Sequence, residues 1–338
     1  MATLATNYRP QKFEAVCGQQ SIIKVLQRQI ETNNISNAYL FAGHTGSGKT
    51  TIARILANEI NKGEGTPIEI DAASNNGVDN IRDLLDSAKE RSLNSTYKVI
   101  ILDEAHQLTT SAWNAILKTL EEPPKYTIFM FCTTEPDKIP ATIQNRVQRF
   151  NLTRINQNEI RDRLKLICDM EGFTNYDESI DYIAKVANGG MRDAISMLDK
   201  VSSFDKEIKI ENTLSLLNGV SYKQLFDLTN AIIDCNEKSI IDIIDSLYYS
   251  GFDLKVFINN YLEFVFDLNK YSLFANINVV KIPASYENDL KYTINIENAH
   301  KYFTHLCDCV LNIKNTIKYD TQCKTTIIIM LLQICRGC

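Results

Sequence analysis

Four residues near the start of the chain have the spacing of a phosphate-binding loop. Gly43, Gly48, Lys49 and Thr50 fit the pattern G-x-x-x-x-G-K-[ST], between an apolar run and a helix-like segment. Backbone N–H groups at a helix N-terminus surround an anionic phosphate, the lysine bridges two phosphates, and the threonine hydroxyl faces Mg²⁺. We therefore expect ATP to bind at Gly43, His44, Thr45, Gly46, Ser47, Gly48, Lys49, Thr50 and Thr51.

Two acidic residues follow a second apolar run. Asp103 and Glu104 come directly after Val-Ile-Ile-Leu. In an open α/β sheet the carboxyl ends of the strands face the ligand crevice. We expect Asp103 to hold Mg²⁺ and Glu104 to polarise the attacking water as a general base. An acidic helix start is the alternative, but it does not explain the abrupt end of the apolar run.

The letters Asp-Glu-Ala-His, which end at His106, are also the signature of a helicase class. Such a helicase needs a second domain of alternating strands and helices. The sequence after residue 155 has helical spacing instead, so we interpret His106 as a local structural residue.

Three further positions carry polar side chains that could act on a bound nucleotide. Thr133 and Thr134 end a third apolar run, and we favour Thr134 as the residue that reaches the γ-phosphate or the water. Arg146 precedes the fifth predicted strand, where it could complete a neighbouring subunit's site; Arg149 lies close enough to be confused with it. Arg192 begins a later helix and could reach the γ-phosphate from a second domain.

Composition sets the broad class of the protein. The 338 residues are 44% hydrophobic and 23% charged, with a net charge of −5, so any contact with DNA must come from a local basic strip. No apolar run reaches the ~18 residues of a membrane span, and the N-terminus lacks the apolar core of a secretory signal. Nine scattered cysteines predict reduced, buried or half-buried thiols in a cytoplasm-like compartment.

The pattern of apolar residues predicts an α/β domain followed by helices. Apolar runs alternate with amphipathic helices from residue 38 to about 153, which is typical of a parallel sheet covered on both faces. Later segments have helical spacing and end at Asn or Gly. We predict a nucleotide-binding α/β domain over 1–154, a helical lid over 155–211, and an all-helical oligomerisation or collar domain over 212–338.

Together these residues resemble the AAA+ ATPases, and more closely the gamma/tau subunits of the bacterial DNA polymerase III clamp loader. The resemblance covers residues 1 to about 210, and Leu-Lys-Thr-Leu-Glu-Glu-Pro-Pro is its most specific motif. The remainder matches only in length and helical character. The matching segments are 8–19, 38–51, 68–86, 99–124, 133–147 and 189–199.

The resemblance implies a function and a set of roles. It implies an ATPase that, with sister subunits in a pentamer-like ring or spiral, opens a sliding clamp and closes it around primed DNA. It makes Thr134 and Arg192 the two nucleotide sensors and Arg146 the arginine finger supplied in trans. Tyr8, Arg9 and Pro10 match the segment that lines the base and phosphate pocket.

The sequence departs from the family pattern at two places. Family members usually carry a four-cysteine zinc module after the loop helix, whereas residues 61–66 contain no cysteine, so we predict no zinc. Asn145-Arg146-Val147 stands where Ser-Arg-Cys is usual. The missing module is compatible with a phage or reduced-genome relative. The resemblance therefore implies a cytoplasmic protein, bacterial or, if phage-encoded, in the cytoplasm of the host. The family's polymerase- and helicase-binding extension is not expected after the third domain.

Basic residues after the second predicted strand suggest a DNA surface. In this family such positions face the duplex held inside the spiral, where they bind phosphates without reading sequence. A solvated charged helix face is the alternative. The residues are Arg82, Lys89, Arg91 and Lys118.

Two other functions stay open from the sequence. One is a different AAA+ DNA motor of the branch-migration type, for which a winged-helix C-terminus would be expected. The other is a non-catalytic clamp-loader scaffold, against which the intact Lys49, Thr50, Asp103 and Glu104 argue. No polymerase carboxylate constellation is present.

Overall fold

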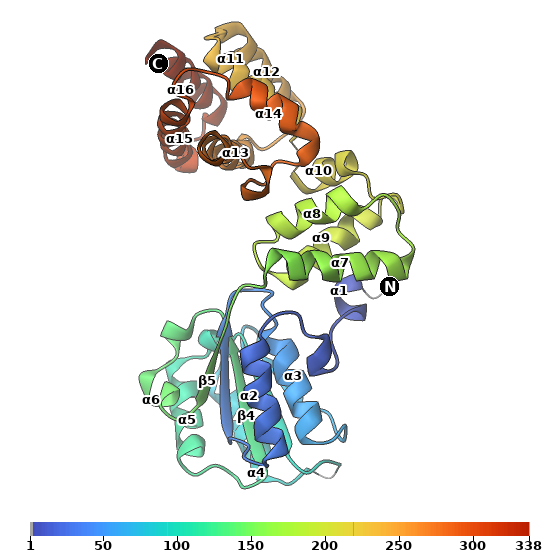
Figure 1. Ribbon diagram of the computed structural model, residues 1–338. Coiled ribbons are helices and arrows are strands. Elements are labelled where there is room, and N and C mark those ends of the chain that lie inside the picture. Colours follow the sequence, from blue (N-terminus) through green and yellow to red (C-terminus); the bar gives the residue numbers. More distant parts are fainter. Residues whose placement is uncertain (1–2, 93, 219, 338) are drawn as a thin grey trace. The chain divides into compact units, whose positions relative to one another are not determined.

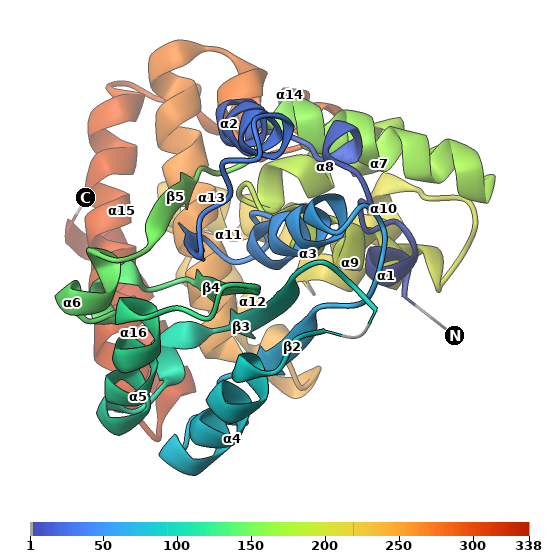
Figure 2. The ribbon, with the colours of Figure 1, turned by 90° about the horizontal axis from the view of Figure 1, so that it is seen from below.

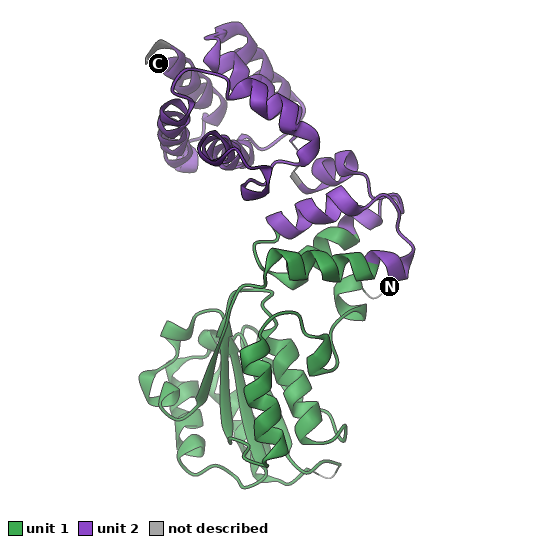
Figure 3. Ribbon diagram, in the orientation of Figure 1, with its two compact units in different colours: residues 1–167, 187–199 green, residues 168–186, 200–338 purple. Residues whose placement is uncertain are grey.

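A computed structural model describes residues 3–92, 94–218 and 220–337. These residues form two compact units, 1–167 with 187–199 and 168–186 with 200–338 (Figure 3). The first unit contains a parallel sheet (Figure 1). Its five strands pair in the order β2-β3-β4-β1-β5. Its strands are β1 Ala38–Gly43, β2 Ile68–Asp71, β3 Lys98–Asp103, β4 Thr127–Thr133 and β5 Gln148–Leu152. The predicted parallel α/β sheet is confirmed.

Helices cover both faces of this sheet, α2 and α3 on one side and α4 and α5 on the other (Figure 2). Successive strand residues point to opposite faces. Tyr39 and Phe41 therefore pack with α2 and α3, whereas Leu40 packs with α4 and α5. Burial on both faces explains the continuous apolar runs of β1, β3 and β4, whereas the two edge strands, β2 and β5, also carry exposed polar residues. The helices are α1 Leu4–Asn7, η1 Phe13–Ala15, α2 Gln20–Glu31, α3 Lys49–Ile60, α4 Val78–Lys89, η2 Ala105–Gln107, α5 Thr110–Glu121, η3 Pro136–Lys138 and α6 Ala141–Gln144.

Local signals fix the ends of the helices that lead to the site. Gly48 adopts φ +100° as the N-cap of α3, a conformation that costs glycine little. Thr109 caps α5 by accepting the Ala112 N–H at 3.3 Å. At the other end of α3, Asn61 and Tyr97 exchange two hydrogen bonds of 2.9 and 2.8 Å, which tie the helix to the start of β3.

The strand order brings three strand ends together. β4 pairs with β1 on one side and with β3 on the other. The phosphate-binding loop leaves β1, Glu104 follows β3, and Thr134 follows β4. Because the strands are parallel, these residues lie at one edge of the sheet, as the sequence predicts.

The second unit is helical. Its core gathers aromatic and branched side chains such as Tyr261, Phe257 and Phe303, all fully buried. Apart from an isolated bridge between Thr174 and Glu207, the described residues after β5 form no strand. The helices are α8 Asp177–Val186, α10 Ile210–Asn218, α11 Tyr222–Ile233, α12 Glu237–Tyr249, α13 Leu254–Phe274, η4 Ile277–Val279, η5 Ala284–Tyr286, α14 Glu287–Thr293, α15 Ala299–Thr316, η6 Ile317–Tyr319 and α16 Cys323–Gly337.

Two helices, α7 Gln157–Glu171 and α9 Met191–Ser202, pass from one unit into the other. Most of each belongs to the first unit, whereas α8 between them belongs to the second. The proposed division at residues 154 and 211 stays a prediction.

The cysteines follow the expected chemistry with one exception. The eight described cysteines are free thiols, buried or half-buried except for Cys235, which is exposed. The prediction of burial is wrong there because Cys235 lies in the turn between α11 and α12, at φ +51°. Cys338 lies outside the described residues. None of the described helices is long and apolar enough to cross a membrane.

The aromatic packing of the sheet makes a test of its core possible. Phe131 of β4 is fully buried. Its ring stacks on that of Phe129 with the centroids 6.4 Å apart, and its centroid lies 5.4 Å from that of the tilted ring of the chain's single tryptophan, Trp113. We expect Phe131→Ala to lower the free energy of unfolding of the first unit by about 3–5 kcal/mol, because it leaves a cavity. The exposed Val25→Ala change should stay within about 0.5 kcal/mol. Urea unfolding followed by circular dichroism would measure both, and equal losses would contradict this packing.

Candidate active site

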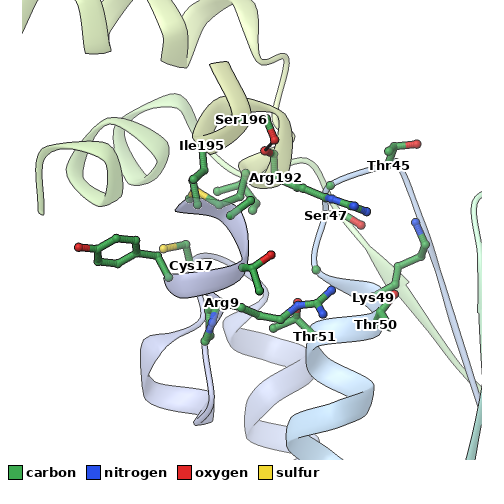
Figure 4. A pocket seen from close by; sticks show the side chains of 18 of the residues that line it. Arg9, Cys17, Thr45, Ser47, Lys49, Thr50, Thr51, Arg192, Ile195 and Ser196 are labelled. Atoms are coloured by element: carbon green, nitrogen blue, oxygen red, sulfur yellow. Dashed lines mark hydrogen bonds between the residues drawn. The ribbon is translucent and has the colours of Figure 1, made fainter. Parts of the chain in front are cut away.

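A cavity of about 420 Å³ opens at the carboxyl edge of the sheet, within the first unit (Figure 4). Its volume falls in the range of small-molecule sites. The N-terminal segment, the phosphate-binding loop, the end of β3 and the start of α9 enclose it. Among the residues predicted to bind or act on a nucleotide, it is lined by Tyr8, Arg9, Pro10, Thr45, Gly46, Ser47, Gly48, Lys49, Thr50, Thr51, Asp103, Glu104 and Arg192.

The loop has the backbone that a phosphate requires. A Cβ on Gly43 would lie 2.8 Å from the carbonyl oxygen of Leu152, so only glycine fits this close approach. Ser47 is 1% exposed, lines the cavity, and its hydroxyl oxygen has no hydrogen-bond partner. Buried polar atoms are normally paired. A phosphate-bearing ligand at this helix N-terminus fits such a cradle.

Lys49 lies beneath the loop and is 6% exposed. Its Nζ donates to the carbonyl oxygens of Gly43 at 2.9 Å and His44 at 3.1 Å. Burial lowers the pKa of the ammonium group, and the carboxylates of Glu104 and Asp103 act in the opposite direction. An ammonium group has three hydrogens, so one N–H remains available to a ligand.

Thr50 and Asp103 form the pair that could hold a metal ion. Thr50 Oγ1 donates to Asp103 Oδ2 at 2.7 Å, and Asp103 Oδ1 accepts the Glu104 N–H at 3.0 Å. Among the described residues, no group of three or more His, Cys, Asp or Glu side chains is arranged to hold a metal ion. One hydroxyl and one carboxylate nevertheless suit Mg²⁺, which keeps several waters and binds substrate phosphates.

Glu104 stands in an unusual backbone conformation. Its φ is +47°, the left-handed region, which costs a residue with a Cβ roughly 1–2 kcal/mol. Such residues often occur at functional sites. The turn directs the half-exposed carboxylate to the cavity edge, where Thr134 Oγ1 lies 3.5 Å from Glu104 Oε2. Thr133, in contrast, is fully buried.

The N-terminal segment closes one side of the cavity. Arg163 of α7 donates to the carbonyl oxygen of Tyr8 at 2.8 Å and so anchors the segment. Arg9 is half-buried, and burial, followed by the nearby Arg54 and Arg192, lowers the pKa of its guanidinium. Mutually repelling cations beside a phosphate-binding loop favour an anionic ligand.

The start of α9 contacts the loop directly. The Met191 N–H donates to the Gly46 carbonyl oxygen at 3.1 Å. A Cβ on Gly46, which has φ +74°, would lie 3.0 Å from the Cα of Gly190, so the two backbones touch. Arg192 extends from α9 toward the loop (Figure 4).

Comparison with known proteins assigns this arrangement to a family. The family model for the DNA polymerase III delta subunit matches residues 18–69 and 66–156, and that for the clamp loader subunit ATPase lid domain matches 159–203. The DNA polymerase III subunit gamma of Buchnera aphidicola is 32% identical over 331 residues, which are 91% of this chain and 90% of that protein. The chain belongs to the gamma/tau family of clamp-loader subunits.

Longer relatives match in part. The DNA polymerase III subunit tau of Bacillus subtilis is 41% identical, over 78% of this chain and 51% of its own length. The gamma/tau subunit of Mycoplasma genitalium is 34% identical, over 88% of this chain and 53% of its own length. The chain thus spans about half the length of these curated relatives. The Thermotoga maritima RuvB Holliday junction branch migration motor has a TM-score of 0.54 at 21% identity, covering 73% of this chain and 86% of that one. This likeness shows the shared AAA+ fold alone.

Several residues predicted for this gamma/tau-family chain lie outside the cavity lining. Gly43, His44 and Thr134 border it through the contacts described above. Arg146 lies elsewhere, where it donates to Glu121 Oε1 at 2.8 Å and to the carbonyl oxygen of Thr142 at 2.9 Å.

The four predicted DNA-contact residues also lie away from the cavity. Arg82 and Lys89 pair with acidic residues of their own helix, α4, at 3.3 and 2.6 Å. The Arg91 guanidinium stands 4.6 Å from the centre of the Tyr126 ring, and Lys118 is exposed.

The apolar residues that line the clamp-loader subunit's cavity were not among those predicted from the sequence. Val16, Cys17, Ile155 and Ile195 line it and could contact a nucleobase. The first two lie inside the matching segment 8–19, so the resemblance could have found them. Ile155 is brought in by its N–H, which donates to the Gly189 carbonyl oxygen at 3.1 Å, and no local pattern signals that contact.

Cys17 offers a test of what fills the cavity. Its thiol is half-buried, and burial raises its pKa, so the reactive thiolate is scarce at neutral pH. A ligand at about 100 times its Kd leaves roughly one site in a hundred open, so MgATP should slow alkylation of Cys17 more than about tenfold. Peptide mass spectrometry would follow the labelling.

Cys235 and a loop variant are the controls for this labelling. The exposed Cys235 should react equally with and without MgATP. Protection of Cys17 should disappear in Lys49→Ala. Equal effects of the nucleotide on both thiols would contradict binding in this cavity.

Proposed function

We propose that the chain is an ATP-hydrolysing subunit of a clamp loader, which opens a sliding clamp and loads it onto primed DNA. The observation that carries the proposal is the convergence of Lys49, Thr50, Asp103 and Glu104 at one cavity. Family membership supports the cellular role. The assembly would include sister clamp-loader subunits, as a hetero- or homo-oligomer, together with the clamp and the DNA.

The residues divide the work of hydrolysis. Bound MgATP supplies the phosphoryl group that is transferred to water. Lys49 and the loop N–H groups offset negative charge on the phosphates, while Thr50 and Asp103 hold the metal-bearing end of the nucleotide. Glu104 accepts a proton from the attacking water. Thr134, 3.5 Å from Glu104, orients the carboxylate and the water.

The lid would transmit the state of the nucleotide. Arg192 senses the γ-phosphate, and Met191 is hydrogen-bonded to Gly46 of the loop. Loss of the γ-phosphate removes the partner of Arg192, so α9 is free to turn about this contact. Because α9 continues past Asp199 into the second unit, its rotation would reach the helical domains. These domains are proposed as the lid over 155–211 and the collar over 212–338.

Contact with DNA is proposed at α4 and the surface beside it. Arg82, Lys89, Arg91 and Lys118 are exposed and would bind phosphates without reading bases. The weak ion pairs of Arg82 and Lys89 on the surface cost little to exchange for phosphates.

The two rival functions receive less support. A branch-migration motor with a winged-helix C-terminus would need strands there, and the described residues of 210–337 are helical. A non-catalytic scaffold would not need the strained turn at Glu104.

ATP turnover tests the proposal. The chain alone should hydrolyse ATP slowly, and clamp plus primed DNA should raise the rate. Glu104→Gln should keep nucleotide affinity but lose about 10²–10⁴-fold in rate, because the general base is removed. Lys49→Ala should lose binding as well. Phosphate release and filter binding would measure these effects, and turnover indifferent to clamp and DNA would oppose the assignment.

Arg146 is proposed as the finger that completes a neighbouring subunit's site. Glu121 and Thr142 occupy two of its N–H groups, which leaves three for a phosphate. The side chain is 38% exposed and stands outside its own cavity. Arg149 is held by Gln144 and Asn151 at 3.0 and 2.8 Å and serves as the control.

Mixing variants tests action in trans. In the assembled oligomer, Arg146→Ala should lower turnover about 10³-fold or more while ATP still binds. Arg149→Ala should stay within about threefold, the effect of a surface contact. A mixture of Lys49→Ala and Arg146→Ala subunits should recover activity, since the first supplies fingers and the second supplies sites. No recovery, with mixed oligomers demonstrated by pull-down, would show that Arg146 does not act across subunits.

A further inference from the structure

His106 occupies an interior position next to the proposed general base. It lies in η2, two residues after Glu104, and its side chain is 5% exposed. The ring does not line the cavity. A buried imidazole must satisfy two ring nitrogens, and both have polar neighbours.

The Nδ1 side of the ring faces the ends of β3 and β4. Nδ1 lies 3.4 Å from Glu104 Oε2 and 3.2 Å from Thr133 Oγ1. An ionised carboxylate only accepts hydrogen bonds, so contact with Glu104 requires a hydrogen on Nδ1. Glu104 Oε2 is also the oxygen that Thr134 reaches. These contacts restrain one carboxylate oxygen, and the other is left for the cavity.

The Nε2 side of the ring faces Gln107 of η2 and the loop after β4. The side-chain amide nitrogen of Gln107 donates to Nε2 at 3.1 Å, which fits a ring whose hydrogen is on Nδ1, and Glu135 Oε1 lies 3.3 Å from Nε2 with no hydrogen between the two atoms. Glu135 is itself held, because its N–H donates to Thr133 Oγ1 at 3.0 Å and Lys138 pairs with its carboxylate at 3.0 Å. The ring is thus fixed at both nitrogens and cannot turn without breaking contacts.

We propose that His106 is a positioning residue for hydrolysis, which holds the Glu104 carboxylate through Nδ1 in the orientation required of the base. The proposal rests on the role of Glu104 proposed above. Glu104 is half-exposed and itself has the left-handed backbone, so its flexible side chain depends on such contacts for a fixed orientation. His106 joins it to the rigid end of the sheet.

Matched substitutions separate the two nitrogens. The asparagine amide in His106→Asn lies where Nδ1 was, whereas the glutamine amide in His106→Gln lies nearer the place of Nε2. We expect His106→Gln to lower single-turnover hydrolysis about tenfold or more, because a misplaced base loses its geometry. His106→Asn should stay within about threefold of the parent rate. Equilibrium binding of MgATP and the melting temperature should be unchanged in both variants.

A second pair of variants tests whether the effect passes through Glu104. In the Glu104→Gln background, His106→Gln should leave the residual rate unchanged, because no carboxylate remains to be oriented. The same loss in both backgrounds would overturn the proposal and make the histidine merely structural. So would equal rates for His106→Asn and His106→Gln, or a loss that follows weaker ATP binding.

Failure of the proposed function would look different. If Glu104→Gln hydrolysed ATP at the parent rate, Glu104 would not be the base, whatever the histidine variants did. Parent activity that depends on Glu104, with both histidine variants unaffected, would reject the inference alone.

Discussion

Burial of one ammonium group sets the demands that the rest of the first unit meets. Lys49 is almost inaccessible, and a buried charge is tolerated only when polar partners replace water. Two loop carbonyls accept its hydrogens, and the carboxylates of Asp103 and Glu104 oppose the fall in pKa that burial causes. Those carboxylates lie near the ammonium group because β3, which they follow, is separated from β1 by a single strand, β4. The strand order of the sheet is therefore what allows the charge of Lys49 to be balanced.

At the same edge of the sheet, the polar side chains at the end of β4 have different partners. Consecutive residues alternate in direction, so Thr133 turns inward to the His106 ring and Thr134 turns toward Glu104. His106, which the sequence suggests only as a local structural residue, lies between two carboxylates. A residue adjacent to a motif can thus contact the motif without lining the cavity.

Most of the fold and the polar part of the site could be predicted from the sequence. Strand 38–43 and the middle of strand 98–103 are apolar because both faces of the sheet are covered, and the loop has fixed spacing. Contacts between distant segments could not be predicted, because no local pattern encodes them. Examples are the hydrogen bonds from Arg163 to Tyr8, from Ile155 to Gly189 and from Arg146 to Glu121. The exposed Cys235 shows that an apolar neighbourhood in sequence does not ensure burial at a turn.

The close approach of Gly46 and Gly190 constrains how this sequence can change over time. A side chain on Gly46 would meet the backbone of Gly190, and a side chain on Gly190 would meet Asp193 Oδ2 at 2.6 Å. A side chain on Gly190 would also lie 3.3 Å from the carbonyl oxygen of Thr45, so a larger residue at either position would push the two segments apart. Evolutionary drift in the loop and at the beginning of α9 is therefore linked, although the two segments are far apart in the gene.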